Sequence, residues 1–134
     1  MSTSTRPLPL PDPDTDPFWA ATRERRLTYQ RCGRCDRVVF YPRRHCSHCG
    51  STDLRWHTSA GRGVIYTFTV IRRQDHPFFR SRLPYVLAYV DLDEGFRILA
   101  EVVADPESVR IGQPVTVEWE DHEQLRIPIF RPAL

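Results

Sequence analysis

The chain is predicted to be mainly β, with a short N-terminal helix, a rubredoxin-like metal ribbon and a five-stranded barrel. Two observations carry this prediction. Four cysteines form two C-x2-C pairs within residues 28–58, and five β-branched or aromatic runs separated by turn residues fill residues 61–132. The 134 residues suffice for one such domain with a small satellite, but not for two full domains.

The cysteine ribbon is the most specific feature of the sequence. Cys32 and Cys35 form the first pair, and Cys46 and Cys49 form the second after ten intervening residues. Each pair brings two thiolates to one ion, and two pairs complete a tetrahedral site that suits Zn²⁺, although thiolates also hold iron. Because four protein ligands leave no open coordination position, the ion is expected to be structural rather than catalytic.

The residue after each cysteine pair is expected to turn left-handed, which lets backbone N–H groups point at sulfur. Gly50 suits this position, whereas Asp36 at the matching place tolerates the conformation less well. His45 and His48 lie in the same segment and are alternative ligands, although four cysteines are sufficient. The ribbon is expected to draw its stability from the metal, because it has little apolar core.

A flexible arm is predicted for residues 1–16, where proline and polar residues leave little surface to bury. A short helix should follow from Asp16-Pro17 to about residue 26, with Asp16 as its N-cap. Such a short helix is not stable alone, so Phe18 and Trp19 must dock. They dock either on a partner or on this chain's own core, and the second alternative is preferred.

Five strands are predicted for the second half, and their short spacing without a long helix favours a closed or partly open barrel. Gly61 and Gly63, which flank Arg62, are expected to bend or bulge the chain where it enters the barrel. Asp93-Glu94-Gly95 is typical of a hairpin turn. The expected strands are Val64–Ile71, Tyr85–Leu92, Phe96–Val103, Val115–Trp119 and Leu125–Phe130.

The long connection 72–84 is expected to be functional or mobile, because loops of this length are uncommon in compact domains. It places Phe78 and Phe79 among four arginines. The two rings either face a partner or a phosphate-bearing ligand, or tuck under the loop and close the barrel end. The four arginines are Arg72, Arg73, Arg80 and Arg82.

Charge is unevenly distributed, although the net charge is only +2. Residues 17–83 carry an excess of arginine, whereas acidic residues outnumber arginines in residues 84–134. All 19 basic residues are arginine, and a GC-rich coding bias explains the absence of lysine. Such a bias does not explain why basic and acidic residues are concentrated in different halves of the chain. Guanidinium groups grip phosphate bidentately, so the basic half can hold phosphates. Alternatively, the two halves pair with each other in three dimensions.

Several classes of function are disfavoured. No apolar run approaches the roughly 18 residues of a membrane helix, and the N-terminus lacks the apolar segment of a secretory signal. Cysteines without an export signal indicate a reducing compartment, so a cytoplasmic location is expected. His57, His76 and His122 are scattered, and neither a nucleophile motif nor a Gly-rich phosphate loop is present. No catalytic residues are therefore assigned to this chain.

The order of these features resembles the DUF35 family, whose members combine a zinc ribbon with an OB-fold. The resemblance covers residues 17–132. It implies a helix and zinc ribbon at 17–58 and an OB-fold barrel at 59–134. Besides the four cysteines, it rests on Phe18-Trp19, Cys49-Gly50, Trp56, Gly61-Arg62-Gly63, Val64–Phe68, Pro84-Tyr85-Val86, Asp91–Gly95, Arg110-Ile111-Gly112 and Phe130-Arg131-Pro132.

The resemblance implies a non-catalytic accessory subunit in a hetero-oligomer with a thiolase-like enzyme, or with an acyl-CoA hydratase. Such thiolase-like enzymes include steroid side-chain aldolases and acyltransferases. The small subunit stabilises its partner and helps to form an acyl-CoA site, with zinc in a structural role. Loop arginines can meet the phosphates of CoA, and apolar rings can cover its acyl chain. The candidate ligand- or partner-binding residues are Phe18, Trp19, Arg72, Arg73, Phe78, Phe79, Arg80 and Arg82.

Two other functions compete with this one. OB-folds and zinc ribbons also bind single-stranded nucleic acid by stacking in a basic groove, but the low net charge disfavours it here. A redox or metal-transfer role for the cysteines ranks third, because the βαβ context of a thioredoxin-like pair is absent from the sequence pattern.

Overall fold

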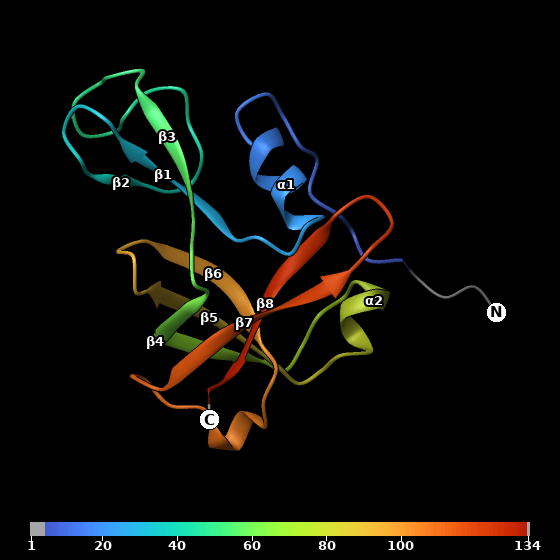
Figure 1. Cartoon of the computed structure of the whole chain (residues 1–134). Coiled ribbons are helices and arrows are strands. Elements are labelled where there is room, and N and C mark those ends of the chain that lie inside the picture. Colours follow the sequence, from blue (N-terminus) through green and yellow to red (C-terminus); the bar gives the residue numbers. More distant parts are fainter. Residues whose placement is uncertain (1–4, 134) are drawn as a thin grey trace.

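The ribbon and the barrel are two separate sheets joined by residues 59–61 (Figure 1). The computed structural model describes residues 5–133. The ribbon sheet is antiparallel with strand order β2-β1-β3. Its strands are β1 (Thr28–Cys32), β2 (Val38–Val39) and β3 (Leu54–Thr58).

The barrel closes in the order β4-β5-β6-β8-β7, which confirms the predicted five-stranded barrel. Every strand begins or ends within a few residues of its expected bound, because turn residues mark the ends clearly. The strands are β4 (Arg62–Ile71), β5 (Tyr85–Leu92), β6 (Arg97–Val102), β7 (Pro114–Asp121) and β8 (Arg126–Pro132).

The junction between β6 and β8 is the weakest seam of the barrel. These strands run parallel and share one register pair, Val102 with Phe130, beside which Val103 N–H donates to the Phe130 carbonyl at 2.8 Å. The other strand junctions carry longer ladders. Within the described residues, Val102 and Phe130 are the one register pair between β6 and β8, so the two strands separate away from it.

Helix α1 (Asp16–Thr22) is shorter than the sequence predicted. Thr15 rather than Asp16 is the N-cap residue, and its side chain makes no capping hydrogen bond. The Thr22 hydroxyl donates to the Trp19 carbonyl at 2.5 Å and accepts from Arg126 N–H at 3.2 Å, which ties the last turn to β8. Arg25 then has φ = 56°, so the chain leaves the helix well before residue 26.

Phe18 and Trp19 dock on this chain's own core, as preferred from the sequence. Phe18 is 1% exposed and Trp19 9%, and their rings meet edge to face at 4.9 Å between centroids. Phe18 also contacts Phe40 of the ribbon at 5.9 Å, and Phe40 stacks on Phe96 of the barrel at 4.9 Å. These aromatic contacts join the helix, the ribbon and the barrel into one core.

The described part of the predicted arm, residues 5–15, lies against the rest of the chain. Arg6 pairs with Glu120 at 3.2 Å, and Leu8 packs against the main core. The flexibility of the arm stays a prediction, and residues 1–4, like residue 134 of the predicted barrel domain, lie outside the described part.

Of the bend or bulge predicted at Gly61 and Gly63, the bulge lies further along the chain. The register between β4 and β5 shifts between Ile65 and Thr67, so the bulge lies inside β4. Gly61 is needed for a different reason: it has φ = 76°, and a Cβ there would lie 2.3 Å from Cγ1 of Val117. The position therefore requires glycine because the chain entering β4 passes close to β7. The sequence pattern alone could not distinguish this role of glycine from a role in a bulge.

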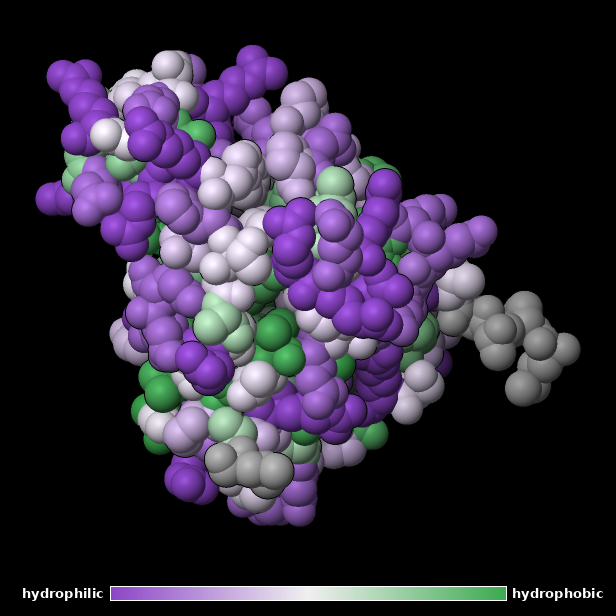
Figure 2. Space-filling view, viewed as in Figure 1, coloured by the Kyte–Doolittle hydropathy of each residue, from purple (hydrophilic) through white to green (hydrophobic). Residues whose placement is uncertain are grey.

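The segregated charges partly pair across the fold. Arg25 beside α1 reaches Asp121 at the end of β7 at 3.5 Å, and Arg82 reaches Glu101 of β6 at 2.8 Å. Figure 2 shows hydrophilic side chains over most of the ribbon, whereas hydrophobic ones are more frequent on the barrel. The pairing alternative is thus realised at these positions, while other arginines stay exposed.

Candidate metal centre and ligand groove

The four cysteines converge on one point of the ribbon. Their sulfur atoms all lie within 4.8 Å of one another, and the pairs Cys32–Cys49 and Cys35–Cys46 are each 3.6 Å apart. These separations are too long for disulfides. They are close to the roughly 3.8 Å between sulfurs that each stand about 2.3 Å from a tetrahedral zinc ion. The donor set therefore fits a four-thiolate zinc site.

Backbone donors already point at two of the sulfurs. The N–H groups of Arg34 and Cys35 lie 3.4 and 3.5 Å from Sγ of Cys32, and that of His48 lies 3.3 Å from Sγ of Cys46. Such contacts stabilise thiolates and orient metal ligands. Each cysteine pair thus directs backbone N–H groups at the sulfur of its first cysteine.

The thiol acidity follows from these contacts. The N–H of Cys35, followed by other hydrogen bonds, lowers the pKa of Cys32 to about 6 against the effect of burial. Burial raises the pKa of Cys46, but N–H groups of Cys49 and His48 outweigh it, so its net pKa is also lowered. Metal binding requires thiolates, so these donors favour the ligand form of Cys32 and Cys46 before an ion arrives. At Cys35 the N–H of Arg37 lowers the pKa, but burial and the neighbouring thiols outweigh it and raise the pKa to about 11.

Both turns that follow the cysteine pairs are left-handed, as predicted. Asp36 has φ = 63° and Gly50 has φ = 77°. Their N–H groups donate to the carbonyls of Cys32 and Cys46, each at 2.9 Å. The backbone is thus equivalent at the two positions, although only one of them carries glycine.

Replacing Asp36 with glycine is expected to stabilise the ribbon by about 0.5–1 kcal/mol, because the left-handed backbone costs a non-glycine residue energy. The exposed pair between Asp36 and Arg31 at 3.3 Å offsets little of this gain. The matched change Gly50→Ala should destabilise by a similar amount. Denaturant titrations of both zinc-loaded variants check the two signs, and the same sign for both would contradict this account.

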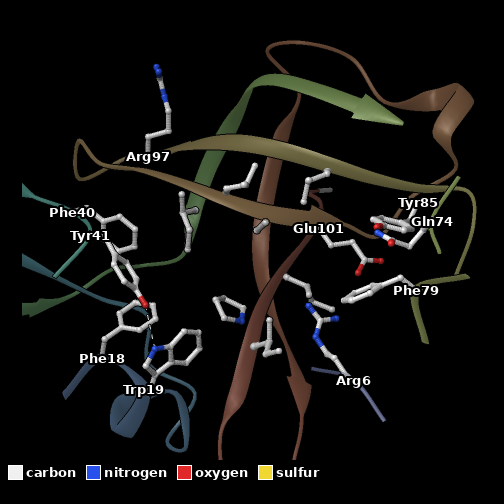
Figure 3. A pocket seen from close by; sticks show the side chains of 17 residues that line it. Arg6, Phe18, Trp19, Phe40, Tyr41, Gln74, Phe79, Tyr85, Arg97 and Glu101 are labelled. Atoms are coloured by element: carbon white, nitrogen blue, oxygen red, sulfur yellow. Dashed lines mark hydrogen bonds between the residues drawn. The ribbon is translucent and has the colours of Figure 1, made fainter. Parts of the chain in front are cut away.

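A groove of about 660 Å³ lies where β6 and β8 separate (Figure 3). Its floor is formed by β6, β5 and β8, while α1, the end of the ribbon and the 72–84 loop form its walls. Its volume falls in the usual range of about 300–1,000 Å³ for small-molecule sites. Aromatic side chains dominate the walls; they are Phe18, Trp19, Phe40, Tyr41, Phe79 and Tyr85.

The 72–84 loop contains a short helix, α2 (Pro77–Arg80), which the sequence did not predict. The Nδ1 atom of His76 accepts from Phe78 N–H at 3.1 Å and begins this turn, so His76 has a structural role. Phe78 and Phe79 are half-buried and meet edge to face at 5.2 Å between ring centroids. Phe79 lines the groove, so part of this loop is brought to the same site as α1.

Arg82 is the least available of the four loop arginines. It binds Glu101 at 2.8 Å and Glu120 at 2.6 Å, and its guanidinium lies 4.6 Å from the Phe78 ring centroid. Arg6 pairs with the same Glu120 carboxylate at 3.2 Å, and His122 Nε2 lies 2.5 Å from it. These five polar residues, called here the Glu120 cluster, join the arm, the loop, β6 and β7.

The other three loop arginines are more open. Arg72, Arg73 and Arg80 are exposed. Arg72 makes a long 3.9 Å pair with Glu107 of the short 3-10 helix η1 (Pro106–Ser108), and Arg80 donates to the Asp75 carbonyl at 2.8 Å. Within residues 5–133, these three side chains do not line the groove, but their loop supplies Gln74 and Phe79 to it.

The structure therefore brings together part of the predicted set. Phe18, Trp19 and Phe79 line one groove, whereas the arginines stand on the neighbouring loop or, for Arg82, in the Glu120 cluster. Sequence reasoning missed Arg6, because the arm carried no sign of where it packs. It also missed Tyr41. The sequence offered one weak signal for this residue, namely its position directly after Phe40 in the ribbon.

A four-thiolate ribbon followed by a closed five-stranded barrel defines the class of zinc-ribbon OB-fold proteins. Two family models match in this order: the ChsH2 rubredoxin-like zinc ribbon domain over residues 19–55, and the ChsH2 C-terminal OB-fold domain over residues 56–120. The chain belongs to this family, which is the DUF35 family.

Named relatives agree with this membership. A probable enoyl-CoA hydratase alpha subunit of Thermomonospora curvata is 40% identical over 120 residues; the match covers 87% of this chain but only 37% of that protein. A DUF35 domain-containing scaffold protein of Methanocaldococcus jannaschii is 35% identical over 72% of this chain and 70% of its own length. The benzoylsuccinyl-CoA thiolase subunit BbsA of Geobacter metallireducens is 28% identical over 63% and 56%.

A solved structure has the same architecture. The chain named Ltp2-ChsH2(DUF35) aldolase superposes with a TM-score of 0.86 at 36% identity, covering 95% of this chain and 100% of that one. Among residues 5–133, none of the helices has the length and apolar character needed to cross a membrane.

Proposed function

We propose that this chain is a non-catalytic accessory subunit that binds a thiolase-like enzyme and helps to form its acyl-CoA site. The groove is the observation that carries the ligand part of the proposal, because its walls are aromatic and its neighbouring loop is basic. The names of the relatives support the enzyme part. They describe subunits of hydratase and thiolase enzymes that act on CoA thioesters, and a DUF35 chain of an aldolase.

The groove suits the acyl portion of such a ligand. Apolar side chains of β5, β6 and β8 form its floor, and aromatic rings flank them. Burying apolar surface there contributes about 25 cal/mol per Å². Phe18 and Trp19 of α1 line this surface, so we propose that they form one wall of the ligand site.

The exposed arginines of the loop suit the phosphates of CoA. Arg72, Arg73 and Arg80 project from the segment that also supplies Phe79 to the groove. Guanidinium groups bind phosphate oxygens through charge-assisted, bidentate hydrogen bonds. Arg82 already binds two carboxylates, so its place in the proposal is to position the loop, with Phe78 packed against it.

Reversing the charge of Arg72, Arg73 and Arg80 together to glutamate is expected to weaken binding of an acyl-CoA by at least about tenfold, equivalent to about 1.4 kcal/mol. The binding is measured by Trp19 fluorescence in a chain whose other tryptophans, Trp56 and Trp119, are replaced by phenylalanine.

The matched control reverses three exposed ribbon arginines, Arg34, Arg37 and Arg43, and so changes the net charge by the same amount. Affinity of this control should stay within about twofold of the parent at physiological ionic strength, because screening removes distant charge effects. Equal losses in both triple variants would show that only net charge matters and would overturn the assignment of the loop.

The remaining parts of the proposal concern partner and location. A hetero-oligomer with a thiolase-like or hydratase subunit places the chemistry in the partner. The cytoplasmic location rests on the four thiols, which suit a reducing compartment. Binding of single-stranded nucleic acid is not favoured, and its appearance with a steep salt dependence would count against the acyl-CoA site.

A further inference from the structure

We infer that the groove holds an elongated apolar chain with its polar end beside Arg6 and Gln74 and its apolar tip against Tyr41, so that Tyr41 sets the longest chain accepted. This inference rests on the proposed function for the identity of the ligand. It adds the direction in which the ligand lies and a residue that determines specificity.

The two ends of the groove differ in polarity. In Figure 3, the polar side chains Arg6, Gln74 and Glu101 gather at one end beside the Phe79 and Tyr85 rings, while the other end has only aromatic side chains and the outward-directed Arg97 among its labelled residues. The floor runs along β6 from residue 101 to residue 97, which spans about 13 Å at about 3.3 Å per residue. An amphipathic ligand therefore gains most in one orientation.

Arg97 does not reverse this polarity, although it lines the aromatic end. Its guanidinium lies 3.5 Å from the Tyr66 ring centroid and binds Asp91 at 2.6 Å. Both partners belong to neighbouring strands, β4 and β5, and Figure 3 shows the side chain directed away from the other labelled residues. Its charge is thus already matched outside the groove.

The polar end offers donors to a carbonyl. Gln74 Oε1 accepts from the N–H groups of Asp75 and His76 at 3.0 and 3.3 Å, which assigns the amide orientation and leaves its Nε2 as a donor. Arg6 binds Glu120 through one terminal nitrogen, while its buried Nε has no partner among the described residues. The Nε2 donor of Gln74 suits a thioester carbonyl, and the positive charge of Arg6 favours the same polar end without a direct bond to its buried Nε.

Tyr41 closes the aromatic end of the groove, and neighbouring aromatic side chains hold its ring in place. The Tyr41 hydroxyl accepts from Trp19 Nε1 at 3.2 Å, and its ring lies 5.8 Å from Phe18 and 5.5 Å from Phe40 between centroids. Phe18 and Trp19 are buried, whereas Tyr41 is 43% exposed. Tyr41 is therefore the wall residue whose removal opens the end of the groove to solvent without removing a core side chain.

The test measures dissociation constants of the zinc-loaded full chain for saturated acyl-CoAs of increasing length. In the parent, each methylene should strengthen binding about fourfold, from about 0.8 kcal/mol per buried CH₂, until the chain reaches Tyr41 and the gain stops. Tyr41→Ala should move this plateau to longer acyl chains. Tyr41→Phe keeps the ring, and Trp56→Ala removes an exposed ribbon aromatic that does not line the groove.

Both control variants should keep the plateau of the parent. Zinc content and thermal melting of each variant establish that it is folded. A plateau at the same length in Tyr41→Ala would overturn the inference while leaving the proposed function intact. If the parent binds acyl-CoAs with no dependence on chain length, the groove does not hold the chain. If neither the free chain nor its partner complex binds them, the proposed ligand itself is wrong.

Discussion

Replacing Cys46 with serine is expected to release the metal and unfold the ribbon while the barrel strands stay largely formed. Around the four cysteines the ribbon has only a small apolar cluster, made of Cys32, Val39 and Cys46 with Cys35 and Leu54 packed against it, whereas Tyr29 and Phe40 at its base pack into the main core. Removing one ligand of a structural zinc site removes most of the binding energy that folds such a segment. The barrel has its own closed sheet, and its strands supply most of the core that it shares with α1 and the base of the ribbon, so it does not depend on the ion in the same way.

Metal analysis should show bound zinc falling from one ion per chain to almost none. Hydrogen exchange should accelerate in residues 28–58 and stay slow in β5 and β6. Ser47→Ala, which changes an exposed neighbour inside the same pair, is the control and should retain zinc and protection. A Cys46→Ser chain with full zinc occupancy and an unchanged melting temperature would contradict the four-cysteine site.

Removing the Glu120 carboxylate is expected to be the most damaging change in the barrel surface. Glu120→Gln removes the negative charge that Arg6 and Arg82 share, although both guanidinium groups are largely covered and only Arg82 keeps a second carboxylate, Glu101. Breaking fully buried ion pairs costs about 3–5 kcal/mol, and we expect about 2 kcal/mol here because solvent still reaches the edge of the cluster. Glu118 lies on the same strand as Glu120 and forms an exposed ion pair with Arg131. Because the pair is exposed, Glu118→Gln should lower the free energy of unfolding by less than about 1 kcal/mol.

The pH dependence of this effect has a defined sign. Burial raises the pKa of Glu120, but hydrogen bonds from His122 and Arg82 and the charge of Arg6 outweigh it, so the pKa lies below its usual 4.5. The stabilisation is therefore complete above that usual value and is lost as pH falls through the lowered folded-state pKa.

Denaturant titrations between about pH 7 and about pH 3 measure this stabilisation as the difference between the parent and Glu120→Gln. Acid also strips zinc from thiolates, but it does so in both proteins, so the difference isolates the carboxylate. The difference should be constant above the usual pKa and shrink below it. A difference that grows in acid would contradict the assigned sign.

The architecture was largely predictable because it depends on local signals. The C-x2-C pairs mark the ribbon, and turn residues such as Gly95, with φ = 98°, separate the strands of the barrel. The helix end was not predictable, because Thr22 is tied to β8 by a tertiary hydrogen bond from Arg126. The bulge was misplaced because glycine serves close packing and bulges alike, and only the position of Val117 distinguishes the two for Gly61.

The groove was predictable only in its parts. Phe18 and Phe79 were selected as apolar rings that need a surface, and both line the groove. The groove lies where β6 and β8 separate, and it exists because these strands share one register pair, Val102 with Phe130. No local sequence pattern encodes this pairing between distant strands. The Glu120 cluster pairs Arg6 with Glu120, 114 positions apart in the sequence, so its members appeared as unrelated charges.

The most direct test of the accessory-subunit role is to purify the tagged chain from its native host, size it and identify what co-elutes. We predict a hetero-oligomer with a near-stoichiometric thiolase-like or hydratase subunit, which acts on CoA thioesters and loses stability when this chain is removed. A chain that elutes alone, or one that carries nucleic acid in place of a protein partner, would contradict the proposed role.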